Sequence, residues 1–256
     1  MAGKIICIAN QKGGVGKTTT AINLGTSIAL HKRKTLIIDM DPQGNAGSGL
    51  GISNNGDSSI YQALVLGKKI DSIVQKTEIP NLFFVPSNID LTGAEIELVN
   101  MEEREYRLQK SLEQIKSEFD FLFIDSPPSL GLLTINSLVA SDSVLIPLQC
   151  EYYALEGLSQ LLKTVKLVKT RLNPDLSLEG ILLTMFDKRN NLSHQVMEDI
   201  KHHFSSKMFD VIIPRNVRLA ESPSHGKPVF FYDRQSVGSK KYIELAQCII
   251  KQEGNS

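Results

Sequence analysis

The sequence of 256 residues predicts an α/β fold, a mostly parallel twisted β-sheet with helices on both faces. Two observations predict it. Short apolar runs alternate along the chain with longer amphipathic runs, and the apolar runs are rich in Ile, Leu, Val and Phe without strict alternation. The second pattern is typical of strands buried on both faces. Because no internal repeat or long linker divides the chain, we expect one domain over residues 1–256.

The predicted elements follow from this alternation in chain order. The apolar runs predict strands at 4–9, 35–40, 82–86, 121–125, 143–148, 178–186 and 211–214. The amphipathic runs predict helices at 17–31, 104–118, 153–172, 192–204 and 239–251. Turn-rich segments fall at 42–59 and 126–131. Helices between successive strands favour right-handed crossovers and therefore parallel pairing.

Composition narrows the function classes. Lys and Arg together number 28, as do Asp and Glu, so no global field draws the chain to nucleic acid or to a membrane. The cysteines Cys7, Cys150 and Cys248 are far apart, which argues against a disulfide framework or a zinc site within the chain. No apolar run reaches the roughly 18 to 20 residues of a membrane span. The first ten residues also carry too short an apolar run for a signal peptide, so we expect a cytoplasmic protein.

The strongest motif is NQKGGVGKTTT at residues 10–20, between the first predicted strand and the first predicted helix. Its three glycines let the backbone wrap a phosphate with N–H groups pointing inward, and they are Gly13, Gly14 and Gly16. The helix N-terminus adds partial positive charge. Lys17 can neutralise phosphate oxygens, and the Thr18 hydroxyl stands where Mg²⁺ would bind beside them.

The start of this loop departs from the usual G-x-x-x-x-G-K-[ST] pattern. Gln11 stands where the first glycine is expected, and Lys12 follows it. Because Lys12 precedes the wrapping glycines, it need not point into its own phosphate site. A lysine displaced outward could reach a phosphate bound by a second subunit and add charge where the transition state is negative.

Aspartates end two of the predicted strands. Asp125 ends the strand at 121–125, where a carboxylate would hold Mg²⁺ or its water shell. Asp39 lies near the end of the strand at 35–40, and Asp41 directly follows that strand. Residues two apart in a strand share a face, so either of these two could point to the phosphate site.

The phosphate loop KGGVGKTT resembles the deviant Walker A loop of the ParA/MinD ATPases, which are P-loop NTPases. The resemblance is best to the short chromosome-partitioning ParA type, also called Soj. It continues in the family's order through most of the chain, in the blocks DMDPQGNAGSGLG (39–51), FLFIDSPPSLG (121–131), QCEYYALEGL (149–158) and IPRNVRLAESPSHGKP (214–228).

The resemblance implies an ATPase that forms a nucleotide-sandwich dimer, with Lys12 crossing to the partner's ATP. It implies that Asp41 orients or activates the attacking water, and that Asp39 is its structural neighbour. The residues implied to bind the phosphates are Lys12, Gly13, Gly14, Val15, Gly16, Lys17, Thr18 and Thr19. Thr18 and Asp125 are expected to hold Mg²⁺. The resemblance also places the base at Pro214 and Asn216.

The base itself is expected to be adenine. Guanine-specific sites of this broad class commonly use N/T-K-x-D late in the chain, and the sequence has no such motif. The nearest segment, FDKRN at 186–190, places its lysine after the aspartate instead. We therefore expect ATP and Mg²⁺ as the cofactors.

Charge is uneven in the last quarter of the chain. Ten Lys and Arg stand against five Asp and Glu between residues 188 and 241. This excess with few aromatic residues suits phosphate contacts better than base reading. The resemblance implies nonspecific binding of double-stranded DNA by the ATP dimer, nucleoid association and stimulation by a ParB-type protein. Arg189, Arg215 and Arg218 are the predicted DNA contacts.

Three other functions use related sequences. A MinD-like membrane-associated positioning ATPase would need a C-terminal amphipathic helix with a basic flank. The tail YIELAQCIIKQEGNS has a polar flank and one lysine, which favours a helix packed on the domain. An electron-transfer or scaffold ATPase would need clustered cysteines, and a small-molecule kinase would not need the second lysine of the loop.

Overall fold

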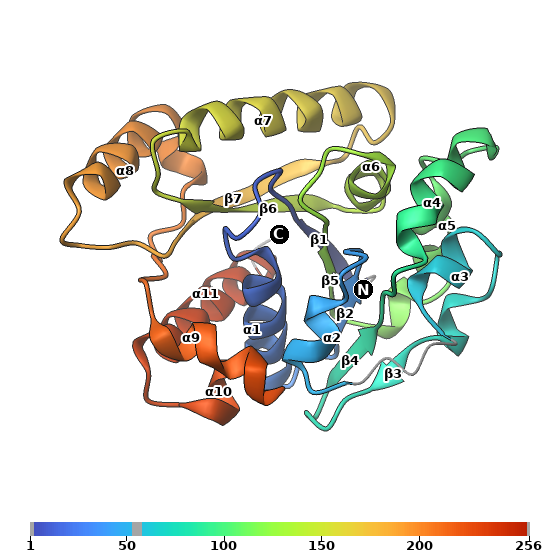
Figure 1. Ribbon diagram of the computed structural model, residues 1–256, viewed down its shortest axis with the longest axis horizontal. Helices are drawn as coiled ribbons and strands as arrows, with labels where there is room; N and C mark the ends of the chain where they lie inside the picture. The colour runs from blue at the N-terminus through green and yellow to red at the C-terminus, as the bar shows by residue number, and fades with distance from the viewer. Residues whose placement is uncertain (1–2, 53–57, 255–256) are drawn as a thin grey trace.

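The computed structural model describes residues 3–52 and 58–254. Within them the chain forms one sheet of seven strands in the order β3-β4-β2-β5-β1-β6-β7 (Figure 1). The strands are β1 (Lys4–Ile8), β2 (Thr35–Asp39), β3 (Gln75–Lys76), β4 (Leu82–Val85), β5 (Phe121–Asp125), β6 (Ser143–Gln149) and β7 (Ser177–Thr184). Only the β3–β4 pair is antiparallel among the described strands. The predicted fold class, a mostly parallel sheet with helices on both faces, is confirmed.

Eleven α-helices occur in the described residues. They are α1 (Lys17–Leu30), α2 (Asn45–Gly49), α3 (Ile60–Leu64), α4 (Leu91–Glu97), α5 (Arg107–Glu113), α6 (Leu132–Val139), α7 (Ala154–Arg171), α8 (Asn191–Phe204), α9 (Val217–Glu221), α10 (Val229–Tyr232) and α11 (Val237–Gly254). Figure 1 shows α1, α9, α10 and α11 on one side of the sheet and α3 to α8 on the other. The central strand β1 therefore buries both of its faces.

The alternation of side chains along β1 divides the core. Ile6 and Ile8 point into the cluster under α1 and α11, whereas Ile5 and Cys7 point into the clusters on the opposite face. Successive residues of a strand face opposite sides of the sheet, so a doubly covered strand must be apolar throughout. This requirement explains why the strand runs lack polar alternation.

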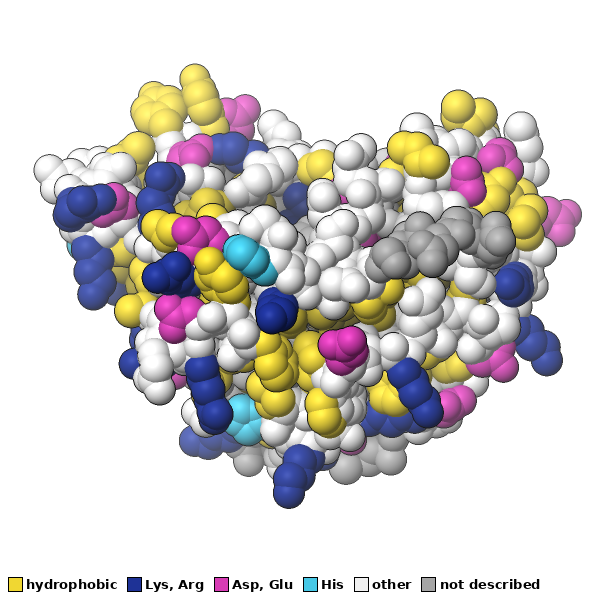
Figure 2. All heavy atoms as spheres, turned by 60° about the horizontal axis from the view of Figure 1, so that its bottom comes forward, with side chains coloured by type: hydrophobic (Ala, Val, Ile, Leu, Met, Phe, Trp, Pro, Cys, Tyr) yellow, Lys and Arg dark blue, Asp and Glu magenta, His cyan; other side chains and the backbone are white. Residues whose placement is uncertain are grey.

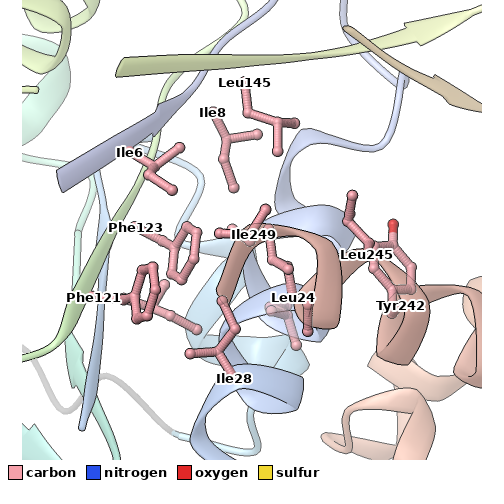
Figure 3. Packing of buried hydrophobic residues seen from close by; sticks show 14 of the residues in the cluster. Ile6, Ile8, Leu24, Ile28, Phe121, Phe123, Leu145, Tyr242, Leu245 and Ile249 are labelled. Atoms are coloured by element: carbon pink, nitrogen blue, oxygen red, sulfur yellow. The ribbon is translucent and has the colours of Figure 1, made fainter. Parts of the chain in front are cut away.

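Helices α1 and α11 anchor the start of the chain to its end. Figure 3 shows Leu24 and Ile28 of α1 and Ile249 of α11 grouped near the stacked rings of Phe121 and Phe123. The two ring centroids lie 6.2 Å apart. Full burial of each such side chain contributes about 1.5 to 3 kcal/mol. This packing holds the N-terminus of α1 fixed relative to the strand ends.

One predicted strand is wrong and one short strand was not predicted. Residues 211–214 do not form a strand, although Ile213 donates its N–H to the Leu183 carbonyl at 2.9 Å and lies beside the end of β7. Pro214 has no N–H to continue a ladder. β7 itself ends at Thr184 and not at residue 186, because Met185 has a φ of 48°. The short strand β3 pairs antiparallel at the sheet edge.

The long helices agree with prediction to within a few residues, except the one predicted at 104–118. There the structure has α5, which begins only at Arg107, and a separate 3₁₀ turn at Lys116–Glu118. Glu103, just before the predicted start, has a left-handed φ of 50°, which is not helical. Six short helices were not predicted, namely α2, α3, α4, α6, α9 and α10. The helix α3 carried a readable signal, a capping box formed by Ser59 and Gln62. Helix α2 falls in the predicted turn-rich segment 42–59. Residues 53–57 of that segment lie outside the described residues.

Candidate functional site

The Gly-rich loop joins the end of β1 to the start of α1, as predicted. Gly14 and Gly16 have φ angles of 75° and 92°, in the left-handed region that side chains disfavour. Gly16 is the residue that immediately precedes the helix. The loop therefore brings backbone N–H groups and the positive end of α1 together, which is a ready site for a phosphate.

Lys17 lies inside this loop. Its side chain is buried, and Nζ donates a hydrogen bond to the Lys12 carbonyl at 3.0 Å. Burial lowers the pKa of Lys17, while the charges of Asp125 and Asp41 act to raise it. An anion entering the loop would meet a poorly solvated ammonium group, and such a group binds phosphate strongly because it gives up little hydration.

Lys12 lies at the start of the loop and outside the cavity that the loop lines. Its side chain is half exposed and forms an ion pair with Glu151, just before α7. The preceding Gln11 donates to the Gln160 side chain at 3.0 Å, so the start of the loop is held against α7 by two contacts. Tyr152 and Tyr153 directly follow Glu151 and are 77% and 70% exposed. Their rings stack edge to face, with centroids 5.0 Å apart. Lys12 is thus on an exposed, aromatic part of the surface.

Asp125, at the end of β5, interacts with Thr18 and Lys17 at the start of α1. It is buried, and neither of its oxygens has a partner with full hydrogen-bond geometry among the described residues. Burial raises the pKa of Asp125 to about 7, against the lowering effects of the Thr18 hydroxyl and the Lys17 charge and with a further increase from Asp41. Two unpaired buried oxygens beside the Thr18 hydroxyl fit Mg²⁺, which prefers oxygen ligands.

Asp39 and Asp41 differ in their surroundings. The buried carboxylate of Asp39 accepts the N–H of Asp41 at 3.0 Å and that of Ala46 at 3.1 Å. Asp39 therefore holds the turn that carries Asp41. The half-buried Asp41 accepts the N–H of Gln43 at 3.0 Å through one oxygen and lines the cavity described next.

A cavity of about 830 Å³ joins the phosphate loop to a segment some 200 residues later. Of the residues predicted to bind the nucleotide or to act in hydrolysis, those that line it are Gly13, Gly14, Gly16, Lys17, Thr18, Thr19, Asp41, Pro214 and Asn216. Asn216 also caps α9, because its side-chain oxygen accepts the Leu219 N–H at 3.3 Å. Val15 does not line the cavity: it is buried, and its carbonyl accepts the Thr184 hydroxyl at 2.8 Å.

Comparison with known proteins identifies the family. A family model described as an AAA domain matches residues 3–178. The chromosome partitioning protein ParA of Myxococcus xanthus (strain DK1622) is 58% identical over 252 residues, 98% of this chain and 89% of that protein. The chain belongs to the ParA family of partitioning ATPases. The sporulation initiation inhibitor protein Soj of Bacillus subtilis (strain 168) is 56% identical, over 96% of this chain and 97% of its own length.

Solved structures share the fold of this ParA family member. Cobyrinic acid a,c-diamide synthase from Mycobacterium smegmatis, with bound ATP analog and magnesium, superposes with a TM-score of 0.87 at 34% identity, covering 98% of this chain and 96% of that one. A putative plasmid partition protein from Borrelia burgdorferi B31 bound to AMPPNP has a TM-score of 0.85 at 28% identity, covering 98% and 99%. The predicted recognition of the ParA/MinD family is confirmed.

The three arginines predicted for DNA binding have unlike surroundings in this ParA family member. Arg189 is 88% exposed and pairs with Asp187 through two hydrogen bonds at 2.9 and 3.1 Å. Arg218 pairs with Glu221 and Asp233 at 3.0 and 3.2 Å. Arg215 lines the cavity. Two of the three therefore already have acidic partners in a single copy of the chain.

Sequence reasoning missed many of the residues that line the cavity, and Tyr242 and Met185 are two examples. Tyr242 of α11 donates to or accepts from the Thr20 hydroxyl of α1 at 3.1 Å and is fully buried. Met185 follows the last residue of β7. The sequence signal for Met185 is its place at the carboxyl end of a parallel strand, where ligands of such sheets bind. No local signal identifies Tyr242, because its contact with α1 spans 222 positions.

Proposed function

We propose that this ParA family ATPase is a DNA-partitioning switch: ATP drives a sandwich dimer, the dimer binds DNA nonspecifically, and hydrolysis releases it. The observation that carries the proposal is the separation of the two loop lysines. Lys17 is buried inside the phosphate loop, whereas Lys12 lies half exposed and paired with Glu151 outside the cavity. Lys12 is therefore available to a second copy of the chain.

ATP and Mg²⁺ are supported by the cavity and by the related structures. The 34%-identical synthase structure holds an ATP analog and magnesium. In the present chain the phosphates would bind the loop amides and Lys17, and Thr18 with Asp125 would hold Mg²⁺, which neutralises phosphate charge. Pro214 and Asn216 line the same cavity as the phosphate loop, which supports their role at the base.

Hydrolysis requires a water aligned with the γ-phosphate. We assign the orientation of this water to Asp41, which lines the cavity. One carboxylate oxygen of Asp41 accepts the Gln43 N–H, and the other has no hydrogen-bond partner among the described residues. The water oxygen bonds to the γ-phosphorus and a water proton passes to the phosphate that is released; the bond from the γ-phosphorus to the bridging oxygen breaks, and ADP leaves with that oxygen. Lys12 of the partner copy would stabilise the negative charge that develops during this transfer.

DNA binding and the ParB-type partner belong to the same proposal. The similar protein of Myxococcus xanthus is a chromosome partitioning protein, which supports action on DNA at the nucleoid. The basic residues between 188 and 241 are the proposed DNA contacts.

The MinD-like alternative is less well supported, because Tyr242, Leu245 and Ile249 of α11 are buried in the core and do not offer an apolar face to a membrane. In the described part of the chain, no helix has the length and apolar character to cross one.

The variant Asp41→Ala tests the switch at its chemical step. It should bind ATP and dimerise but hydrolyse at least about 100-fold more slowly, because removing a group that positions the nucleophile costs several kcal/mol. Light scattering reports the dimer, and phosphate release reports turnover. Asp71→Ala, at an exposed site outside the cavity, is the matched control. An Asp41→Ala variant that turns over at the parent rate removes Asp41 from the mechanism.

A further inference from the structure

A second cavity lies beside the turn that carries Asp41. Its volume is about 340 Å³, and its walls come from that turn, from α2 and from the segment after β4. Gln43 and Ser48 line both this cavity and the larger one that contains the phosphate loop. Ser87, which also lines the second cavity, donates a hydrogen bond to the Asp41 carbonyl. The second cavity therefore shares a wall with the nucleotide site, and that wall carries Asp41.

The lining of the second cavity combines apolar and polar groups. Phe84, Pro86 and Ile89 contribute apolar surface, whereas Gln43 and Asn88 contribute side-chain amides. Pockets for whole small molecules range from about 300 to 1,000 Å³, so this cavity is at the small end. Its size and lining suit one long side chain with an apolar stem and a polar end, inserted as the anchor of a protein partner.

Exposed apolar side chains continue from the second cavity along α4. Ile89, at the cavity, is 66% exposed, and Ile96 and Val99 are 76% and 49% exposed. The Thr92 N–H donates to the Ile89 carbonyl at 3.0 Å, so helical bonding begins before α4 itself. Ile89 and Ile96 are seven positions apart, about two helical turns, and therefore share a face. Exposed apolar residues that extend from a cavity mark a surface that a partner covers.

The same segment is acidic. Residues 88–103 contain five Asp and Glu and no Lys or Arg, although the charges of the whole chain balance. The acidic residues are Asp90, Glu95, Glu97, Glu102 and Glu103. Within the described part of the chain, only Glu103 of these five forms an ion pair, with Lys110. At the upper right of Figure 2, on the side of α3 to α5, acidic and hydrophobic side chains lie next to one another. Such a surface is complementary to a segment that carries both basic and apolar side chains.

We propose that the second cavity and the stripe of Ile89, Ile96 and Val99 form one docking surface for a basic amphipathic segment of a partner protein, which seats one side chain in the cavity. The occupant is a protein segment and not a small molecule, because the apolar surface extends along α4 beyond the cavity. A side chain seated against Pro42 and Gly44 restricts the turn that carries Asp41, so docking raises the rate of hydrolysis. This inference rests on the proposed function, and it gives the place and the chemistry of the stimulating partner.

A labelled peptide tests the surface directly. The probe is a helical peptide of Lys, Leu and Ala that carries fluorescein and has its Leu residues at three- and four-residue spacing. Fluorescence anisotropy should show that the parent protein binds it at least about tenfold more tightly than matched peptides with Glu in place of Lys or Ser in place of Leu. Equal affinities for the three peptides, or no binding of the Lys and Leu peptide, would overturn the proposal.

Substitutions locate the binding. Ile96→Lys and Glu102→Lys should each weaken binding of the Lys and Leu peptide by about tenfold, because one adds repulsion and the other also removes attraction. Leu167→Lys and Glu78→Lys make the same changes at exposed positions outside the docking surface and should bind the peptide as the parent does. Thermal melting verifies that all four variants fold. Parent-like binding by both Ile96→Lys and Glu102→Lys would place the peptide elsewhere and overturn the proposal.

Phosphate release tests the link to the nucleotide site. With saturating peptide the parent should release phosphate at least about twofold faster, because a restrained turn keeps Asp41 in position for more of the time. Ile96→Lys should hydrolyse ATP at the parent's basal rate and should not respond to the same peptide concentration. Peptide binding that leaves the parent's rate unchanged would contradict the link to Asp41. A parent that hydrolyses ATP but does not bind the peptide overturns only this inference, whereas a parent that binds the peptide but not ATP refutes the proposed function.

Discussion

At the residue scale, two lysines of one loop occupy different surroundings. Lys17 is buried, and its pKa is lowered mainly by that burial. Lys12 is half exposed beside Glu151. The sequence alone predicted the phosphate loop, because its glycines, lysine and threonine act within a few positions of one another. It could not predict the Lys12–Glu151 ion pair, because that contact joins positions 139 apart and depends on how α7 packs.

Lys17→Ala removes the buried ammonium group from the phosphate loop. ATP and ADP affinities should both fall by at least about 100-fold, because charge-assisted hydrogen bonds to phosphate are removed. Calorimetry measures both affinities. Lys12→Ala is the matched control and should bind ATP with nearly the parent affinity as a monomer. Unchanged ATP affinity in Lys17→Ala would contradict the assignment of the phosphate site.

Glu151→Gln removes the charge that holds Lys12 on its own copy. An exposed ion pair contributes about 0.2 to 1 kcal/mol, so freeing Lys12 should lower the ATP concentration needed for dimerisation by up to about fivefold. Lys12→Ala should not dimerise, because two sets of phosphates would face each other with less neutralisation. Light scattering over a titration of ATP compares the two variants. Normal dimerisation and hydrolysis by Lys12→Ala would exclude a role for Lys12 in the partner's site.

At the element scale, the chain just after α2 passes directly against the chain just after the 3₁₀ turn at Ser222–His225. Gly51 and Gly226 have φ angles of 72° and 60°, and a Cβ added to Gly226 would lie 2.8 Å from the Gly51 Cα. Helix α2 and the turn at Ser222–His225 are thereby brought into contact. The glycines were visible in the sequence, but their pairing was not, because each is a common turn residue and the two are far apart along the chain. The apolar run at 211–214 resembles a strand in sequence, but Pro214 has no N–H to continue a ladder beside β7.

Gly226→Ala tests the crossing. The substitution adds both strain at positive φ and a collision with Gly51, so the free energy of unfolding should fall by about 2 to 4 kcal/mol. Gly67→Ala is the control, because Gly67 also has a positive φ of 67° but no atom lies within 4 Å of its added Cβ. That variant should be destabilised by about 1 kcal/mol. Urea denaturation measures both, and equal destabilisation would show that the crossing is not tight.

At the scale of the whole molecule, charge is dispersed. On the face drawn in Figure 2, Lys and Arg side chains are interspersed with Asp and Glu and do not form one continuous patch. Of the ten basic residues between 188 and 241, Arg189, Lys201, Arg218 and Lys241 are in ion pairs. The other six have no ion pair with a described residue, so one copy offers six unpaired positive charges in this region. The fold class could be predicted from the sequence pattern. DNA binding by a dimer could be expected only from the family resemblance, because it depends on the surfaces of two copies together.

Arg218→Glu reverses one of these charges without touching the phosphate loop. DNA affinity should fall by at least about tenfold, because in a two-fold dimer the substitution removes a positive charge from both copies. ATP-driven dimerisation should be unchanged. Arg171→Glu, an equal charge change at the exposed end of α7, is the control and should bind DNA as the parent does. Fluorescence anisotropy measures both, and parent-like DNA binding by Arg218→Glu would remove that residue from the DNA surface.

The most direct test of the switch is the affinity of the parent protein for unrelated DNA duplexes with ATP, with ADP and without nucleotide. Doubling the basic surface in an ATP dimer raises the number of phosphates bound, and nonspecific affinity depends steeply on that number. Anisotropy at several salt concentrations should show binding that requires ATP, falls steeply with salt and differs little between sequences. Equal binding with ATP and ADP, or binding that is insensitive to salt, would contradict the switch even if the protein hydrolyses ATP.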